Sequence, residues 1–182
     1  PAAGSRPRGD RLVATAGHCI RSASDCSGTK FVFGFKLNAS TVNPTEVDAS
    51  QIYSCSKIVH SVVEMAGKDF AIVELDREVT GHSPLSVRRT GTIGIGDGIT
   101  VMGYPSGIPL KISGGANVRR LDKGYFVANL DTYGGNSGSA VFNTTSGEVE
   151  GILVRGETDF VSQGNCRVSK RCTNEECRGE DV

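Results

Sequence analysis

GGNSGSAVF, residues 134–142, places one serine among three glycines, directly before a short apolar run. Glycine adopts backbone conformations that are closed to other residues, so the N–H of Gly135 can point toward a bound substrate. Together with the N–H of Ser137 it would form an oxyanion hole, which stabilises the negative charge that develops on a carbonyl oxygen. Taken alone, the stretch fits an exposed nucleophile and an ordinary Gly/Ser-rich turn equally well.

A catalytic serine needs a base, because its hydroxyl is a poor nucleophile at neutral pH. The chain has three histidines. His18 follows the apolar and small residues 12–17 and precedes a cysteine, whereas His60 follows two apolar residues and His82 lies in a Gly-His-Ser-Pro turn. We therefore expect His18 to be the base, and His60 and His82 to be ordinary strand-end or loop histidines.

The base in turn needs a group that fixes its tautomer. Asp69 opens the apolar run FAIVEL at residues 70–75, and a strand can carry such an aspartate to the floor of a cleft. In isolation, a turn carboxylate that ends a loop is the favoured explanation of this residue.

Three motifs occur in order: TAGHC at 15–19, DFAIVEL at 69–75 and GNSGS at 135–139. Together they resemble the motifs of the trypsin-like (chymotrypsin-fold) serine peptidases, whose His, Asp, Ser order differs from the Ser, Asp, His order of α/β-hydrolases. The resemblance spans about residues 12–156. It implies an all-β fold of two packed antiparallel six-stranded β-barrels. It also implies endopeptidase activity through an acyl-enzyme, with catalytic His18, Asp69 and Ser137 in the cleft between the barrels.

The chain departs from this family pattern in two places. Animal members carry an aspartate before the nucleophile, which receives the new N-terminal ammonium on activation, whereas Asn136 here is uncharged, as in a bacterial branch that resembles the glutamyl endopeptidases. In addition, eleven residues precede Leu12, and the closing strand and C-terminal helix of the family would begin near Val182. We therefore expect a chain that is truncated at both ends.

The resemblance also implies a pocket for the substrate side chain on the acyl side of the cut bond. Its floor lies six residues before the nucleophile, at Asp131, where a carboxylate favours Lys or Arg. Thr132 and the GNSGS style favour glutamate instead, but the strand position at which glutamyl endopeptidases carry a histidine is Leu153 here. Against basic specificity, Arg155 is near enough in sequence to neutralise Asp131. We expect basic specificity. The expected substrate-binding residues are Asp131, Thr132, Leu153, Arg155 and Gly156.

Period-two alternation and frequent turn residues, including 24 glycines, indicate many short strands. The break at residues 80–98 predicts a boundary between an N-terminal barrel (1–90) with the histidine and aspartate and a C-terminal barrel (91–182) with the serine and a Cys-rich terminal loop. The expected strands lie at 12–15, 31–37, 51–59, 70–75, 99–104, 110–113, 125–130, 140–142 and 149–154.

Bulk composition restricts the partners and the compartment. The charges balance at 20 basic and 20 acidic residues, and no apolar run reaches the ~18 residues that span a bilayer, so we expect no nucleic-acid or membrane partner. No metal cluster or nucleotide fingerprint is present, so we expect no cofactor and no metal. The expected partner is a protein or peptide substrate, and the protein is expected to be a monomer.

Six cysteines without a Cys-x-x-Cys pair suit disulfides in a secreted or periplasmic protein. We expect Cys26–Cys55 in the first barrel and Cys166–Cys177 in the C-terminal loop, with Cys19 paired to a cysteine upstream of this sequence. Two other functions remain open: a catalytically inactive binding module on the same fold, and a structural β-sandwich such as an adhesin module, for which the three motifs would be coincidence.

Overall fold

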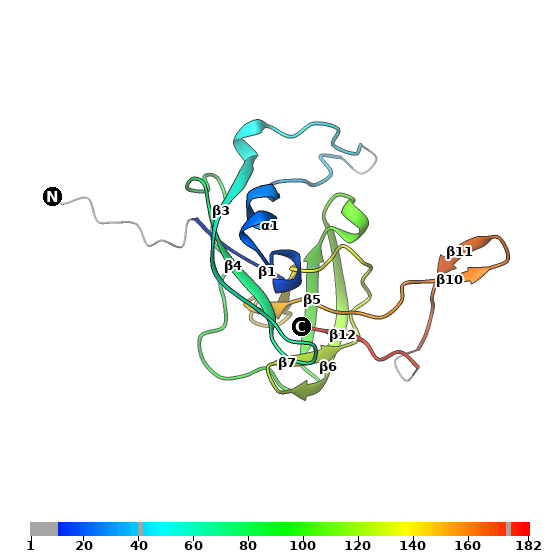
Figure 1. Ribbon diagram of the computed structural model, residues 1–182. Helices are drawn as coiled ribbons and strands as arrows, with labels where there is room; N and C mark the ends of the chain where they lie inside the picture. The colour runs from blue at the N-terminus through cyan, green and yellow to red at the C-terminus, as the bar shows by residue number, and fades with distance from the viewer. Residues whose placement is uncertain (1–10, 40–41, 174–175) are drawn as a thin grey trace.

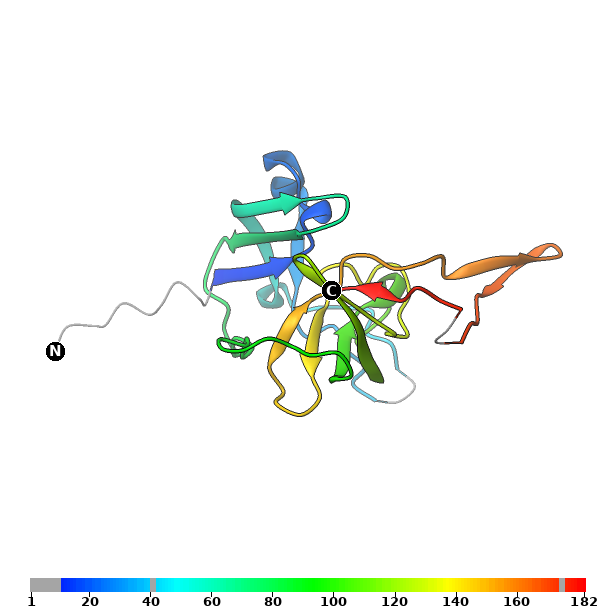
Figure 2. The same cartoon turned by 90° about the horizontal axis from the view of Figure 1, so that it is seen from below.

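The computed structural model describes residues 11–39, 42–173 and 176–182 and consists mainly of two curled antiparallel sheets (Figure 1, Figure 2). No helix among these residues is long and apolar enough to cross a membrane. The helices are η2 (Gly17–Cys19), α1 (Ala23–Gly28), η3 (Ala49–Gln51) and η4 (Pro105–Gly107). The strands are β1 (Leu12–Thr15), β2 (Lys30–Val32), β3 (Ile52–Val63), β4 (Asp69–Leu75), β5 (Gly98–Gly103), β6 (Lys111–Asp122), β7 (Tyr125–Ala128), β8 (Ala140–Asn143), β9 (Val149–Ile152), β10 (Phe160–Gln163), β11 (Cys166–Ser169) and β12 (Glu180–Asp181).

The first sheet has the strand order β1-β4-β3-β2. Strand β4 alternates between buried and half-buried residues, so Ala71 and Val73 enter the core that this sheet encloses. The described residues form four strands here, not the six expected for a full barrel. The strand expected over residues 31–37 ends at Val32, because Gly34 adopts a φ of +71° and turns the chain away from β3.

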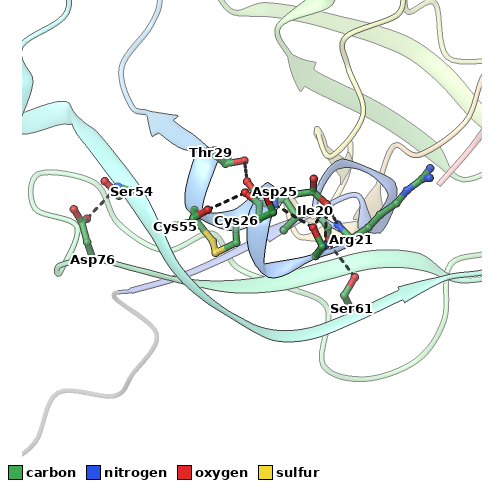
Figure 3. The surroundings of a disulfide bond; sticks show 12 residues. Ile20, Arg21, Asp25, Cys26, Thr29, Ser54, Cys55, Ser61 and Asp76 are labelled. Atoms are coloured by element: carbon green, nitrogen blue, oxygen red, sulfur yellow. Dashed lines mark hydrogen bonds between the residues drawn. A yellow bond between two sulfur atoms is a disulfide. The ribbon is translucent and has the colours of Figure 1, made fainter.

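Helix α1 was not expected from the sequence. Ser22 and Asp25 form a capping box at its start, in which each side chain accepts a hydrogen bond from the backbone N–H of the other residue. The disulfide Cys26–Cys55 joins this helix to β3, which confirms the predicted pairing (Figure 3).

The second sheet contains six strands in the order β12-β7-β6-β5-β8-β9. Its inner face supplies Ile99, Val101, Val118 and Val141 to a second apolar core. Two curled antiparallel sheets with separate cores confirm the predicted all-β, chymotrypsin-like fold class. The last residues pair with β7 through reciprocal backbone hydrogen bonds between Val182 and Phe126, so the C-terminal end lies in the middle of the molecule (Figure 1).

The connection between the sheets, residues 76–97, contains no helix and no strand longer than an isolated bridge, which joins Val87 to Val149. Next to that bridge, the Arg88 guanidinium forms an ion pair with Glu150 on β9. The connection coincides with the break expected at 80–98, and the boundary at residue 90 stays a prediction.

Strands β10 and β11 form a separate hairpin that projects from the second sheet (Figure 2). Cys166 begins β11 and is an exposed free thiol, so the predicted Cys166–Cys177 pair is wrong. Cys177 bonds instead to Cys172, five residues away, and its N–H donates to the carbonyl oxygen of Thr173. Cys19 is also a free, exposed thiol.

Candidate active site

His18 and Asp69 meet at one end of the first sheet. Strands β1 and β4 pair up to Thr15↔Ala71, and η2 then turns the chain so that His18 lies over Asp69. Gly17 permits this turn, because a Cβ there would overlap the carbonyl oxygen of Val62 on β3.

Two hydrogen bonds join the pair. The His18 backbone N–H donates to Asp69 Oδ1 (2.9 Å), and Nδ1 of the ring lies 2.8 Å from Oδ2. A carboxylate accepts, so Nδ1 carries the proton and Nε2 is left as the acceptor. Asp69 is 7% exposed, so water does not compete for this contact.

The loop that carries Ser137 is fixed by the second sheet and rests on the first. The N–H of Gly138 donates to the carbonyl oxygen of Leu153 (2.7 Å). Gly138 has a φ of +85°, and a Cβ there would overlap Thr15 Oγ1 and lie 3.0 Å from the N of Ala16. The loop thus touches the segment that leads to His18. In the part of the chain that the structure describes, no hydrogen bond joins Ser137 to His18; such bonds are often long without a substrate.

Two backbone donors of this loop are free. Neither the N–H of Gly135 nor that of Ser137 has an acceptor within the described residues, whereas the neighbouring N–H of Gly134 donates to Asp159 Oδ2 (2.7 Å). Gly135 has a φ of +93°, and a Cβ there would lie 2.7 Å from the N of Ser106. A side chain at this position would therefore collide with the backbone at Ser106.

Asn136 holds the same loop from inside. It is 4% exposed; its Nδ2 donates to the carbonyl oxygen of Tyr133 (3.1 Å), and its Oδ1 lies 3.4 Å from the Ser139 hydroxyl that donates to it. Both polar atoms of the Asn136 side chain are thus hydrogen-bonded within the loop. Because the amide is uncharged, this position needs no cationic partner.

Two cavities adjoin the loop. One of about 410 Å³ lies toward η4, and one of about 630 Å³ lies toward β12; Asp131, Thr132 and Tyr133 line both. The other residues expected in the substrate pocket lie elsewhere: Leu153 is buried in the second core and lines neither cavity. Arg155, which is half-buried, and Gly156, which is exposed, also line neither cavity.

Arg155 points toward the first sheet, not toward Asp131. Its Nε donates to Asp181 Oδ2 (2.8 Å), and its Nη1 lies 3.8 Å from Asp69 Oδ2. No ion pair between Arg155 and Asp131 occurs within residues 11–39, 42–173 and 176–182. Arg155 therefore does not neutralise Asp131 in this structure, and this argument against basic specificity does not hold here.

Two titratable groups near the site have shifted pKa values. Burial raises the pKa of Glu180 to about 7, and the charges of Asp131 and Glu157 add to that rise. Glu180 Oε2 has no hydrogen-bond partner among the described residues. Although Cys19 is exposed by surface area, partial desolvation of the thiol, followed by the charge of Asp69, raises its pKa.

Sequence reasoning did not identify Glu180 and Asp181 as parts of the site region. Both lie in the two-residue strand β12, whose charged sequence carries no apolar alternation that would predict a strand. Glu180 is half-buried and Asp181 is buried, and their placement follows from pairing with β7, which is visible only in three dimensions.

Comparisons with known proteins identify the family and the fold. The family model described as a trypsin-like peptidase domain matches residues 4–152. A curated glutamyl endopeptidase of Bacillus licheniformis is 28% identical over 151 residues, which are 76% of this chain and 44% of the relative, so the chain spans less than half of that protein.

Two solved structures share the fold. A Glu endopeptidase in complex with MPD superposes with a TM-score of 0.55 at 20% identity, covering 82% of this chain and 71% of that one. A serine endoprotease from Yersinia pestis superposes with a TM-score of 0.53 at 17% identity, covering 82% of this chain and 46% of that one.

Proposed function

Since the chain belongs to the trypsin-like peptidase family, we propose that it is a serine endopeptidase with Ser137 as nucleophile, His18 as general base and Asp69 as orienting acid. The observation that carries this proposal is the double hydrogen bond between His18 and the buried Asp69. It leaves Nε2 of His18 as the basic nitrogen, which is the atom that a serine nucleophile requires.

The reaction follows from these positions. Nε2 of His18 takes the proton of Ser137 Oγ as this oxygen bonds to the substrate carbonyl carbon, and the resulting oxyanion accepts hydrogen bonds from the N–H groups of Gly135 and Ser137. His18 then returns the proton to the amine nitrogen as the C–N bond breaks, which leaves an acyl-enzyme. Water, deprotonated by the same nitrogen, attacks the ester and releases Ser137.

A serine-reactive phosphonate tests the assignment. The purified protein should be labelled at Ser137, and Ser137→Ala should lose labelling together with on the order of 10⁴ to 10⁶ in turnover. Peptidase activity that survives in Ser137→Ala would overturn the proposal. A wild-type protein that neither reacts nor cleaves peptides would support an inactive binding module on the same fold.

We further propose that the protein cuts after Lys or Arg. Asp131 lines both cavities, and Glu180 lines the larger one with it. Glu157 in that cavity is paired with Lys170 (2.8 Å), whereas Asp131 and Glu180 form no ion pair with any described residue. Arg119, Lys170 and Arg171 also line the larger cavity, so the proposal rests on the unpaired carboxylate of Asp131, which would attract a cationic side chain.

The rival specificity comes from the curated relative, which is named for cleavage at glutamate. Paired chromogenic peptides that differ only in Arg or Glu at the cut site distinguish the two. We expect faster cleavage after Arg, and a loss of this preference in Asp131→Asn. Faster cleavage after Glu would contradict basic specificity and direct attention to Thr132.

Two disulfides among the described residues are typical of proteins from oxidising compartments. We propose that the protein acts outside the cytosol, in the secreted or periplasmic space. Mass spectrometry of unreduced peptides from the natural source tests this, because a cytosolic protein would yield free thiols at Cys26 and Cys55.

A further inference from the structure

We propose that Arg155 is a positioning residue for the pair of Asp69 and His18. This inference rests on the proposed peptidase function and extends it to a side chain on the other sheet. The Arg155 guanidinium lies beside the carboxylate oxygen that bonds the His18 ring: Nη1 is 3.8 Å from Asp69 Oδ2.

The guanidinium also binds the turn that delivers Asp69. Its Nη1 donates to the carbonyl oxygen of Glu64 (3.2 Å), and its Nη2 donates to that of Gly67 (2.8 Å). These carbonyls lie in the connection between β3 and β4, and Asp69 is the first residue of β4. One planar group therefore fixes both ends of the turn and lies against the carboxylate that follows it.

Arg155 is itself held in one orientation. Nε donates to Asp181 Oδ2 (2.8 Å), and Asp181 is 4% exposed. The other oxygen of Asp181 accepts from Arg178 Nη1 (2.6 Å), and the backbones of Arg155 and Asp181 also pair. A row of alternating charges thus runs from Arg178 on the C-terminal side to Asp69.

Loss of an ion pair that only stabilises the fold could also lower activity, so the experiment needs a matched control. The ion pair of Arg88 with Glu150 provides it: the Arg88 side chain is 25% exposed and the Arg155 side chain 23%, and each carboxylate partner is almost fully buried. Arg88 bonds Glu150 through both Nε and Nη2 and has no contact with His18, Asp69 or the Ser137 loop among the described residues. Substitution of Arg88 therefore removes a comparable ion pair without changing the contacts of His18 and Asp69.

The kinetic experiment compares wild type with Arg155→Met, Arg155→Lys and Arg88→Met. Small displacements of a catalytic group cost up to about 10²-fold in rate, so Arg155→Met should lower kcat roughly 10- to 100-fold with KM changed less than about threefold. Arg155→Lys should recover part of kcat, because one ammonium can meet Asp181 but cannot reach both carbonyls of the turn. Arg88→Met should keep the wild-type kcat, although it destabilises the fold.

The second measurement does not need activity. The downfield proton NMR signal of His18 Nδ1–H, bonded to Asp69, should be visible in wild type and Arg88→Met and should broaden or disappear in Arg155→Met. If wild type cleaves nothing, the proposed function fails while this signal still decides the role of Arg155. An unchanged signal in Arg155→Met, or equal losses of kcat in Arg155→Met and Arg88→Met, would overturn the inference.

Discussion

Asp69 accepts from His18 twice, once from the backbone N–H and once from the ring, so a single carboxylate fixes both the position and the rotation of the imidazole. If only the ring were hydrogen-bonded, movement of the His18 backbone could still shift the imidazole. Here the peptide plane and the ring are tied to the same buried group, which restricts the ring before any substrate arrives.

The first prediction concerns this pair. Asp69→Asn keeps the size of the side chain but replaces one carboxylate oxygen with an amide nitrogen. This nitrogen is a donor, and it faces either the backbone N–H or the ring of His18, where Asp69 accepts. We expect kcat to fall about 10³- to 10⁴-fold with little change in fold, because the wrong tautomer of His18 is favoured. Steady-state kinetics measure this. Asp76→Asn, just beyond the other end of β4, should be nearly silent; equal effects of the two substitutions would contradict a special role for Asp69.

The second prediction concerns the contact between the two sheets at Gly138. Gly138→Ala strains a φ of +85° and drives its Cβ into Thr15, so it should cost at least about 3 kcal/mol in the free energy of unfolding. Gly147→Ala has a φ of +72° but open space around the added Cβ, so strain alone should cost roughly 1–2 kcal/mol. Urea unfolding of both variants measures the difference, and equal losses would mean that Thr15 can move aside.

The third prediction concerns the disulfide between α1 and β3. Its two cysteines are 29 residues apart, and closing a loop of this length stabilises a protein by about 3.6 kcal/mol, mainly through the unfolded chain. The double variant Cys26→Ser with Cys55→Ser should lose about that much in denaturant unfolding. Cys172→Ser with Cys177→Ser opens a loop of only five residues and should lose less. A larger loss in the second variant would show that the terminal loop is more central to the fold.

Sequence reasoning succeeded where local chemistry determines the structure. The alternation of DFAIVEL is strong enough to predict β4, and three motifs in family order are enough to predict the fold class. It failed where the outcome depends on one backbone angle or on distant pairing. Gly34 follows the end of the strand expected over 31–37, and Cys177 bonds to the nearby Cys172 rather than to Cys166.

Helix α1 was missed for a different reason, because the sequence does contain a motif that predicts it. Ser22 and Asp25 stand three residues apart, which is the spacing of a capping box, and the segment was still not expected to be a helix. No comparable sequence motif predicts the direction in which the Arg155 side chain points. Its partners Glu64, Gly67 and Asp181 lie 91, 88 and 26 residues away, and only the packed fold brings them together.

The last prediction follows from the buried carboxyl of Glu180. Its pKa is raised from 4.5 to about 7, so the native state holds a proton that the unfolded state releases. The free energy of unfolding should therefore fall as pH rises from about 4.5 to 7, by about 1–2 kcal/mol after discounting for solvent screening. Glu180→Gln should remove that fall, so the variant should match wild type at pH 4 and exceed it in stability at pH 8. Glu157 in the same cavity has the opposite sign: Lys170 and the N–H of Arg178 lower its pKa, so Glu157→Gln should lose stability above pH 4.5. Thermal unfolding of the three proteins from pH 4 to 8 measures both effects, and a Glu180→Gln curve parallel to wild type would contradict the raised pKa.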